Sequence, residues 1–133
     1  MTNLDLAVAD TTALLAFTGA LPFEGPPPTD TLLALDASLV DLIDVLCAFH
    51  EGRRADVFGD LAYIGPMVNR WLPANQLATA VTELLLVHPN EAATDLASLA
   101  TARELGVPLL TTQQHLASLV GDADVIVLPR RPA

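Results

Sequence analysis

The sequence has no lysine, a single cysteine and few aromatic residues, and each shortage excludes a class of protein. Six arginines oppose 16 acidic residues, so the formal net charge is −10 with the three histidines neutral. This balance argues against a broad nucleic-acid-binding surface, because phosphate binding is driven by counterion release at cationic patches. Any polyanionic substrate would therefore need a locally positive site.

The low cysteine content also bears on the compartment. With Cys47 as the one cysteine, no disulfide framework is possible and a reducing compartment is expected. Cys47 stands in an apolar segment, which predicts a small buried hydrophobe. No segment reaches the roughly 18 apolar residues that a membrane span requires, and the N-terminal stretch "MTNLDLAVAD" carries no basic signal-peptide region. We therefore expect a cytoplasmic protein.

Aliphatic residues supply most of what is present. Hydrophobic residues make up 52% of the 133 positions and aromatic residues only 5%. A chain of this length buries a core of Leu, Val, Ala and Ile without disulfides or structural metal. No internal repeat and no long linker divides the sequence, so residues 1–133 are expected to form a single domain.

Strand and helix patterns alternate along the chain. The patterns predict strands at residues 4–9, 83–89, 107–112 and 123–129, helices at 12–18, 38–50, 90–105 and 113–120, a proline-rich loop at 21–30 and short helical turns at 53–76. Ser38 and Asp41 have the spacing of a capping box at the start of the second helix. The alternation predicts an α/β fold in which helices cover both faces of a parallel sheet.

Three carboxylates stand at positions that suit a site. Asp10 follows the first predicted strand, where ligands of parallel α/β sheets bind, but it is also a favoured N-cap for the next helix. Asp44 falls at the border of the apolar arc of its helix, so it can point into a cleft. Asp95 faces packing partners and needs a cation, either Arg103 or a shared metal ion, unless it is a partly solvated first-turn residue.

Three stretches carry a family resemblance. "VADTTALLA", "SLVDLIDVLCAF" and "DLASLATARELGVPLLTT" resemble, in this order, three motifs of the PIN-domain ribonucleases, which include the VapC-like toxins. In those motifs an Asp ends the first strand, an acid, usually Glu, lies in an apolar helix, and a second Asp opens a helix of small residues. Asp10, Asp44 and Asp95 take these places. The segment between the second and third motifs is unmatched.

The resemblance implies a PIN-like fold and a metal-dependent RNA phosphodiester hydrolase. Asp10, Asp44 and Asp95 would be its catalytic and metal-binding residues, with Mg²⁺ or Mn²⁺ as the cofactor, since these hard cations prefer oxygen ligands. Thr12 and Gln113 would be auxiliary. The sequence departs from the family pattern twice, because Gln113 stands where a fourth acid is common and Asp44 stands in place of Glu.

Small PIN domains commonly serve as the toxin of a toxin–antitoxin pair. The resemblance therefore implies an RNA substrate, a protein antitoxin with a basic segment and a homodimer, and the acidic composition suits such a basic partner. Two alternatives stay open: a catalytically attenuated PIN-like binding module, favoured by Gln113 and the net charge, and an unrelated α/β domain whose acids are helix caps. His50, on an apolar helix stripe, is expected to be a hydrogen-bonded core histidine, and the three histidines lack the spacing of a zinc site.

Overall fold

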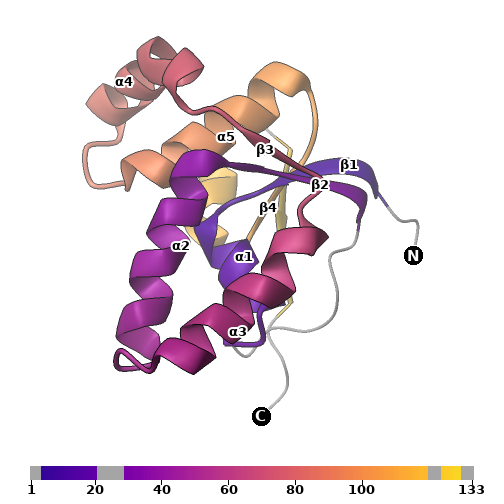
Figure 1. Cartoon of the computed structure of the whole chain (residues 1–133). Helices are drawn as coiled ribbons and strands as arrows, with labels where there is room; N and C mark the ends of the chain where they lie inside the picture. Colours follow the sequence, from indigo (N-terminus) through magenta and orange to yellow (C-terminus); the bar gives the residue numbers. More distant parts are fainter. Residues whose placement is uncertain (1–3, 21–28, 120–123, 130–133) are drawn as a thin grey trace.

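The computed structural model describes residues 4–20, 29–119 and 124–129, and it forms one parallel sheet between two layers of helices (Figure 1). The strands are β1 (Leu4–Ala9), β2 (Thr29–Leu35), β3 (Arg70–Leu72), β4 (Leu109–Thr111) and β5 (Val125–Val127). The helices are α1 (Thr11–Phe17), α2 (Asp36–Phe49), α3 (Arg54–Ile64), α4 (Ala78–Val87) and α5 (Ala93–Leu105), with 3₁₀ turns η1 (Gly65–Met67), η2 (Asn75–Leu77) and η3 (Gln114–Ser118).

The sheet has the strand order β3-β2-β1-β4-β5, and all of its pairings are parallel. The chain builds outward from β1 first toward β3 and later toward β5, so the order reverses between β1 and β4. In open parallel sheets this reversal leaves a crevice at the carboxyl ends of the two strands. Pairing of Ala9 with Leu110 sets the register there, so the next residues, Asp10 and Thr111, lie side by side at the carboxyl ends of the two strands.

Alternate strand residues point to the two helix layers, as the pleat requires. One layer consists of α1, α2 and α3, whose Leu14, Leu42 and Ile64 are fully buried against the sheet. The other consists of α5 with η3 and α4, and its fully buried side chains include Leu96 and Leu99. The predicted α/β fold, with helices on both faces of a parallel sheet, is confirmed.

Two segments differ from the sequence-based assignment. Residues 83–89, predicted as a strand, belong mostly to α4, which packs on α5 away from the sheet (Figure 1). Val81, Leu84 and Leu85 are the partly buried residues that make this contact, and their spacing is helical. Strands β2 and β3 were not predicted; β2 begins at Thr29, inside the expected proline-rich loop, whose residues 21–28 lie outside the described part.

The start and middle of α2 also differ from expectation. Its N-cap is Leu35, with no side-chain cap, so the predicted capping box of Ser38 and Asp41 is wrong. Cys47 is exposed, so the predicted burial of this thiol is also wrong. His50, by contrast, is the expected hydrogen-bonded histidine, with Nε2 2.6 Å from Oδ2 of Asp60 on α3. None of the helices in the described ranges has the length and apolarity that crossing a membrane would require.

Candidate acidic site

Asp10 lies at the carboxyl end of β1, where its carboxylate is enclosed by hydrogen-bond donors. Oδ1 accepts from the backbone N–H of Ala13 at 2.9 Å and from Oγ1 of Thr12 at 2.8 Å, and Oδ2 accepts from Oγ1 of Thr111 at 2.5 Å. The bond to Ala13 is the N-cap bond of α1. The cap expected as an alternative role is therefore present, and it holds Asp10 at the carboxyl ends of β1 and β4.

The Asp10 carboxyl is 0% exposed. Burial raises its pKa from 3.8 to about 6, because the charged form loses its hydration. The hydrogen bonds from Thr111, Ala13 and Thr12 lower this pKa, and the nearby charge of Asp95 raises it. Asp10 is therefore a carboxyl group whose ionised form is only partly compensated by the protein.

Asp95 reaches the same place from the first turn of α5. Its side chain is 8% exposed, and burial raises its pKa, partly offset by a hydrogen bond from the side chain of Gln113. The negative charges of Asp41 and Glu91 raise the pKa of Asp95 further, while His115 lowers it. The structure thus brings Asp10 and Asp95 together, with Gln113 beside both.

The second predicted acid, Asp44, is not brought to this pair. Asp44 is exposed on α2, and it is not among the charges that act on Asp10 or Asp95. Asp41, one turn earlier, faces α5 instead: its Oδ2 accepts from Oγ1 of Thr94 at 3.3 Å, and its charge acts on Asp95. The acid that α2 contributes to the neighbourhood is Asp41.

A polar contact fixes α2 against α5 beside this acid. Oγ of Ser38 lies 3.3 Å from Oγ of Ser98, and both side chains are fully buried. Small hydroxyl side chains let the two helices approach closely at the carboxyl edge of the sheet. Asp41 was not among the predicted site residues, because its spacing from Ser38 matches a capping box and because an apolar pair follows both Asp41 and Asp44.

Thr12 and Gln113, the two auxiliary candidates, both contact Asp10. Thr12 Oγ1 donates to Asp10 and accepts from the backbone N–H of Thr112 at 3.2 Å, so it ties the start of α1 to the segment after β4. Gln113 Nε2 lies 3.5 Å from Oδ2 of Asp10. Thr111, which the sequence analysis did not single out, makes the shortest of the hydrogen bonds to Asp10.

A histidine–glutamate pair borders the acids. Nε2 of His115 on η3 lies 2.9 Å from Oε2 of Glu91, and both groups act electrostatically on Asp95. The His115 side chain is 51% exposed. This pair connects the segment before α5 to the segment after β4.

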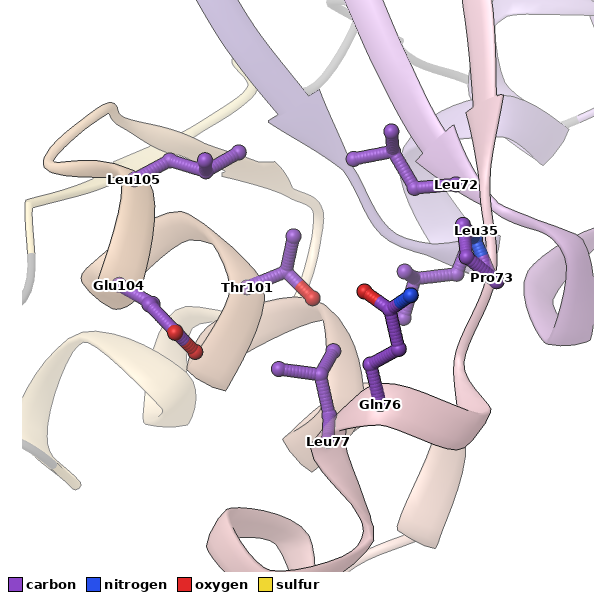
Figure 2. Close-up of a pocket in the computed structure, with 8 residues that line it drawn as sticks. All are labelled: Leu35, Leu72, Pro73, Gln76, Leu77, Thr101, Glu104 and Leu105. Atoms are coloured by element: carbon purple, nitrogen blue, oxygen red, sulfur yellow. The ribbon is translucent and has the colours of Figure 1, made fainter.

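An apolar hollow of about 210 Å³ lies apart from the acids, between η2 and the second half of α5 (Figure 2). Leu72, Leu77 and Leu105 surround it, and the side chain of Gln76 points inward toward Thr101. Asp10, Asp41 and Asp95 do not line it. The hollow therefore adds no group to the acidic site.

The carboxylates suit a hard divalent cation by their chemistry. Within the described ranges, no three His, Cys, Asp or Glu side chains are grouped closely enough to hold a metal ion. Mg²⁺, however, usually keeps several waters and is bound through one or two carboxylates, with oxygen as the donor atom. Two buried carboxyl groups whose pKa burial raises, with the charge of Asp41 acting on Asp95, meet that requirement.

Solved structures share this fold at low sequence identity. VapC20 of Mycobacterium tuberculosis, a toxin that cleaves the sarcin–ricin loop, matches with a TM-score of 0.64 and 17% identity over 92% of this chain and 99% of that chain. PAE2754 of Pyrobaculum aerophilum matches with a TM-score of 0.62 and 16% identity over 92% of this chain and 89% of that chain. A VapBC-5 structure from M. tuberculosis, of the VapBC family of toxin–antitoxin systems, matches with a TM-score of 0.58 and 20% identity over 96% of this chain and 98% of that chain.

No protein-family model and no curated protein sequence matches the chain. The likeness to the solved structures therefore concerns the fold, and it covers almost the whole length of both partners in each comparison. The PIN-like fold expected from the three sequence motifs is confirmed.

Proposed function

We propose that this protein is a metal-dependent endoribonuclease of PIN type that serves as the toxin of a toxin–antitoxin pair. The observation that carries the proposal is the proximity of Asp10 and Asp95, whose charge acts on Asp10, at the carboxyl ends of the strands where the strand order reverses. The shared fold with a toxin that cleaves the sarcin–ricin loop supports RNA as the substrate class.

Asp10 and Asp95 would hold Mg²⁺ or Mn²⁺, and Asp41 would add negative charge or a further ligand. A bound divalent ion supplies two kinds of chemistry there: it lowers the pKa of a water, and it offsets negative charge that develops on the phosphodiester. The residues of the chain orient the acids for this task. Thr12, Thr111 and the backbone of Ala13 fix the rotamer of Asp10, and first-turn placement on α5 fixes Asp95.

Protein partners are supported by exposed apolar side chains and by the net charge. Val40, Phe58 and Tyr63 on α2 and α3 are each at least 60% exposed, and Leu86 on α4 is 79% exposed. An antitoxin whose basic segment approaches the acids would complement the formal charge of −10. A homodimer that covers part of the apolar surface completes the proposal.

RNA cleavage assayed with Mn²⁺ tests the function. The wild type should cut RNA, while Asp10→Ala and Asp95→Asn should each lose at least about 100-fold in rate, since each removes a carboxylate from the metal. Asp44→Asn, an exposed change on the same helix as Asp41, is the matched control and should keep its activity, whereas Asp41→Asn should lower it. Equal cleavage by all of these proteins would trace the activity to a contaminant and refute the proposal.

A second candidate is a PIN-like binding module with attenuated catalysis. It is favoured by one contact: Gln113, in the place of a fourth acid, donates its amide to the carboxylates of the site. An amide supplies no negative charge for a second metal ion. Absence of RNA cleavage by the wild type, together with retained binding of a basic partner segment, would favour this module over the enzyme.

A further inference from the structure

Gln113 occupies a defined position between the two buried carboxyl groups. Its backbone N–H donates to Oγ1 of Thr111 at 3.0 Å, which anchors the residue at the end of β4. Its side-chain Nε2 lies 3.5 Å from Oδ2 of Asp10, and the same side chain also acts on the Asp95 carboxyl, whose pKa it lowers. The amide is half-buried, so both contacts are made in a partly desolvated place.

A primary amide suits this position because its nitrogen carries two N–H donors. Two donors can serve two acceptors, here the carboxyl groups of Asp10, which follows β1, and of Asp95 on α5, which lie 85 residues apart in the chain (95 − 10). A cation shared by the same two carboxylates would need to approach the same oxygen atoms. The amide nitrogen and a shared cation therefore compete for one place.

We infer that Gln113 is an internal substitute for the metal ion: in the metal-free protein its side-chain amide bridges Asp10 and Asp95, and a divalent cation binds only by displacing it. The inference rests on the metal site of the proposed function, but it does not depend on RNA cleavage.

The bridge has two consequences for the site. It keeps two mutually repelling carboxylates close together without a cation, since hydrogen bonds to a charged acceptor are stronger than neutral ones. It also weakens cation binding, because the ion must replace contacts that the protein already makes. A family-typical acid at this position would do the opposite: it would repel the two carboxylates and attract the ion.

Calorimetric titration of Mn²⁺ into the whole chain tests this competition. Gln113→Ala should bind Mn²⁺ about tenfold more tightly than the wild type, the change expected when a hydrogen bond to a charged group no longer has to be broken. Gln113→Glu, which keeps the shape and replaces donors by a carboxylate, should bind more tightly still. Gln114→Ala is the matched control, since Gln114 is the exposed neighbour of the same type, and it should bind like the wild type.

Thermal unfolding provides a reading that separates competition from a general loss of structure. Without metal, Gln113→Ala and Gln113→Glu should melt below the wild type, while their gain in Tm on adding Mn²⁺ should exceed that of the wild type. Circular dichroism at low temperature checks that each variant is folded before it is titrated.

Each outcome decides the inference. Equal or weaker Mn²⁺ binding by both Gln113 variants overturns it, and so does the absence of Mn²⁺ binding by every protein tested, because then nothing competes with the amide. Tighter binding by both variants, with Gln114→Ala unchanged, establishes it. Should that pattern be found while the wild type cleaves no RNA, the proposed function fails and the competition stands.

Discussion

Replacing Asp10 by Asn should stabilise the metal-free protein at neutral pH. Burial raises the pKa of this carboxyl from 3.8 to about 6, so the folded state holds the proton more tightly than the unfolded state does. The stabilisation from this group is fully present below about pH 4 and is lost as the pH rises through about 6. Since each pKa unit is worth about 1.36 kcal/mol, the loss amounts to about 3 kcal/mol.

Asparagine resembles the neutral carboxyl group in shape. Its side-chain oxygen can keep the N-cap bond from Ala13, and the Thr111 hydroxyl can turn to accept from the new amide. We therefore expect Asp10→Asn to match the wild type near pH 4 and to exceed it by up to about 3 kcal/mol near pH 7.5. In a domain of this size the gain corresponds to a rise in Tm of about 10 °C.

Urea denaturation in the presence of a chelator, repeated from about pH 4 to about pH 7.5, measures the difference. Asp44→Asn serves as the control, because it makes the same chemical change at an exposed position of α2, and its curve should run parallel to that of the wild type. A variant Asp10→Asn that is less stable than the wild type at pH 7.5, or a difference that does not change with pH, would refute the reasoning.

Two further predictions concern the scaffold. Gly106 ends α5 with φ at 69°, and a Cβ added there meets nothing within 4 Å. Gly106→Ala should therefore cost only the backbone penalty, about 1 kcal/mol of unfolding free energy measured in urea. A loss above about 3 kcal/mol would mean that the space around the added methyl group is filled. Leu46 is 0% exposed between α2 and the sheet. Leu46→Ala should therefore lower the free energy of unfolding in urea by about 2–5 kcal/mol. A loss below about 1 kcal/mol would contradict the place of Leu46 in the core.

The parts of the site that follow local signals could be predicted from the sequence. An apolar run that ends in Asp and resumes as a helix located β1, Asp10 and α1, and the first strand has the predicted bounds. The glycine after the small-residue helix located the end of α5, because a left-handed C-cap needs a residue that tolerates positive φ. Both signals lie within one turn of the residue they identify.

The choice between Asp41 and Asp44 could not be made from periodicity. Helix α2 is apolar on most of its circumference: Val40, Ile43 and Phe49 are exposed, at 68%, 38% and 51%. An apolar arc that includes these residues therefore does not coincide with the buried stripe of Ser38, Leu42 and Leu46. Burial of a serine beside Ser98 defines the face that turns toward α5, and only the packing of the two helices reveals it.

The same difficulty explains the misassigned helix α4. Its residues 84–87 are consecutive apolar side chains, which a buried strand and a helix can both carry. The helix lies outside the sheet and none of its residues is buried, so Leu86 and Val87 stay exposed, at 79% and 71%. The sequence shows which residues of this segment are apolar, but it does not show which of them contact the rest of the protein. A helix that packs on one side only leaves the others exposed.

The acidity of the chain and its proposed RNA substrate are reconciled by where the charge lies. Burial keeps Asp10 partly protonated near pH 6 and raises the pKa of Asp95, so the metal-free crevice is less negative than its carboxylates suggest. Gln113 adds donors without adding positive charge, and a divalent ion that displaces it would reduce the negative charge of the crevice further. Most of the remaining acids in the described ranges are exposed and attract cations of any kind. RNA can therefore approach best when a metal ion occupies the crevice, and a basic antitoxin segment is attracted by the same charges that repel RNA.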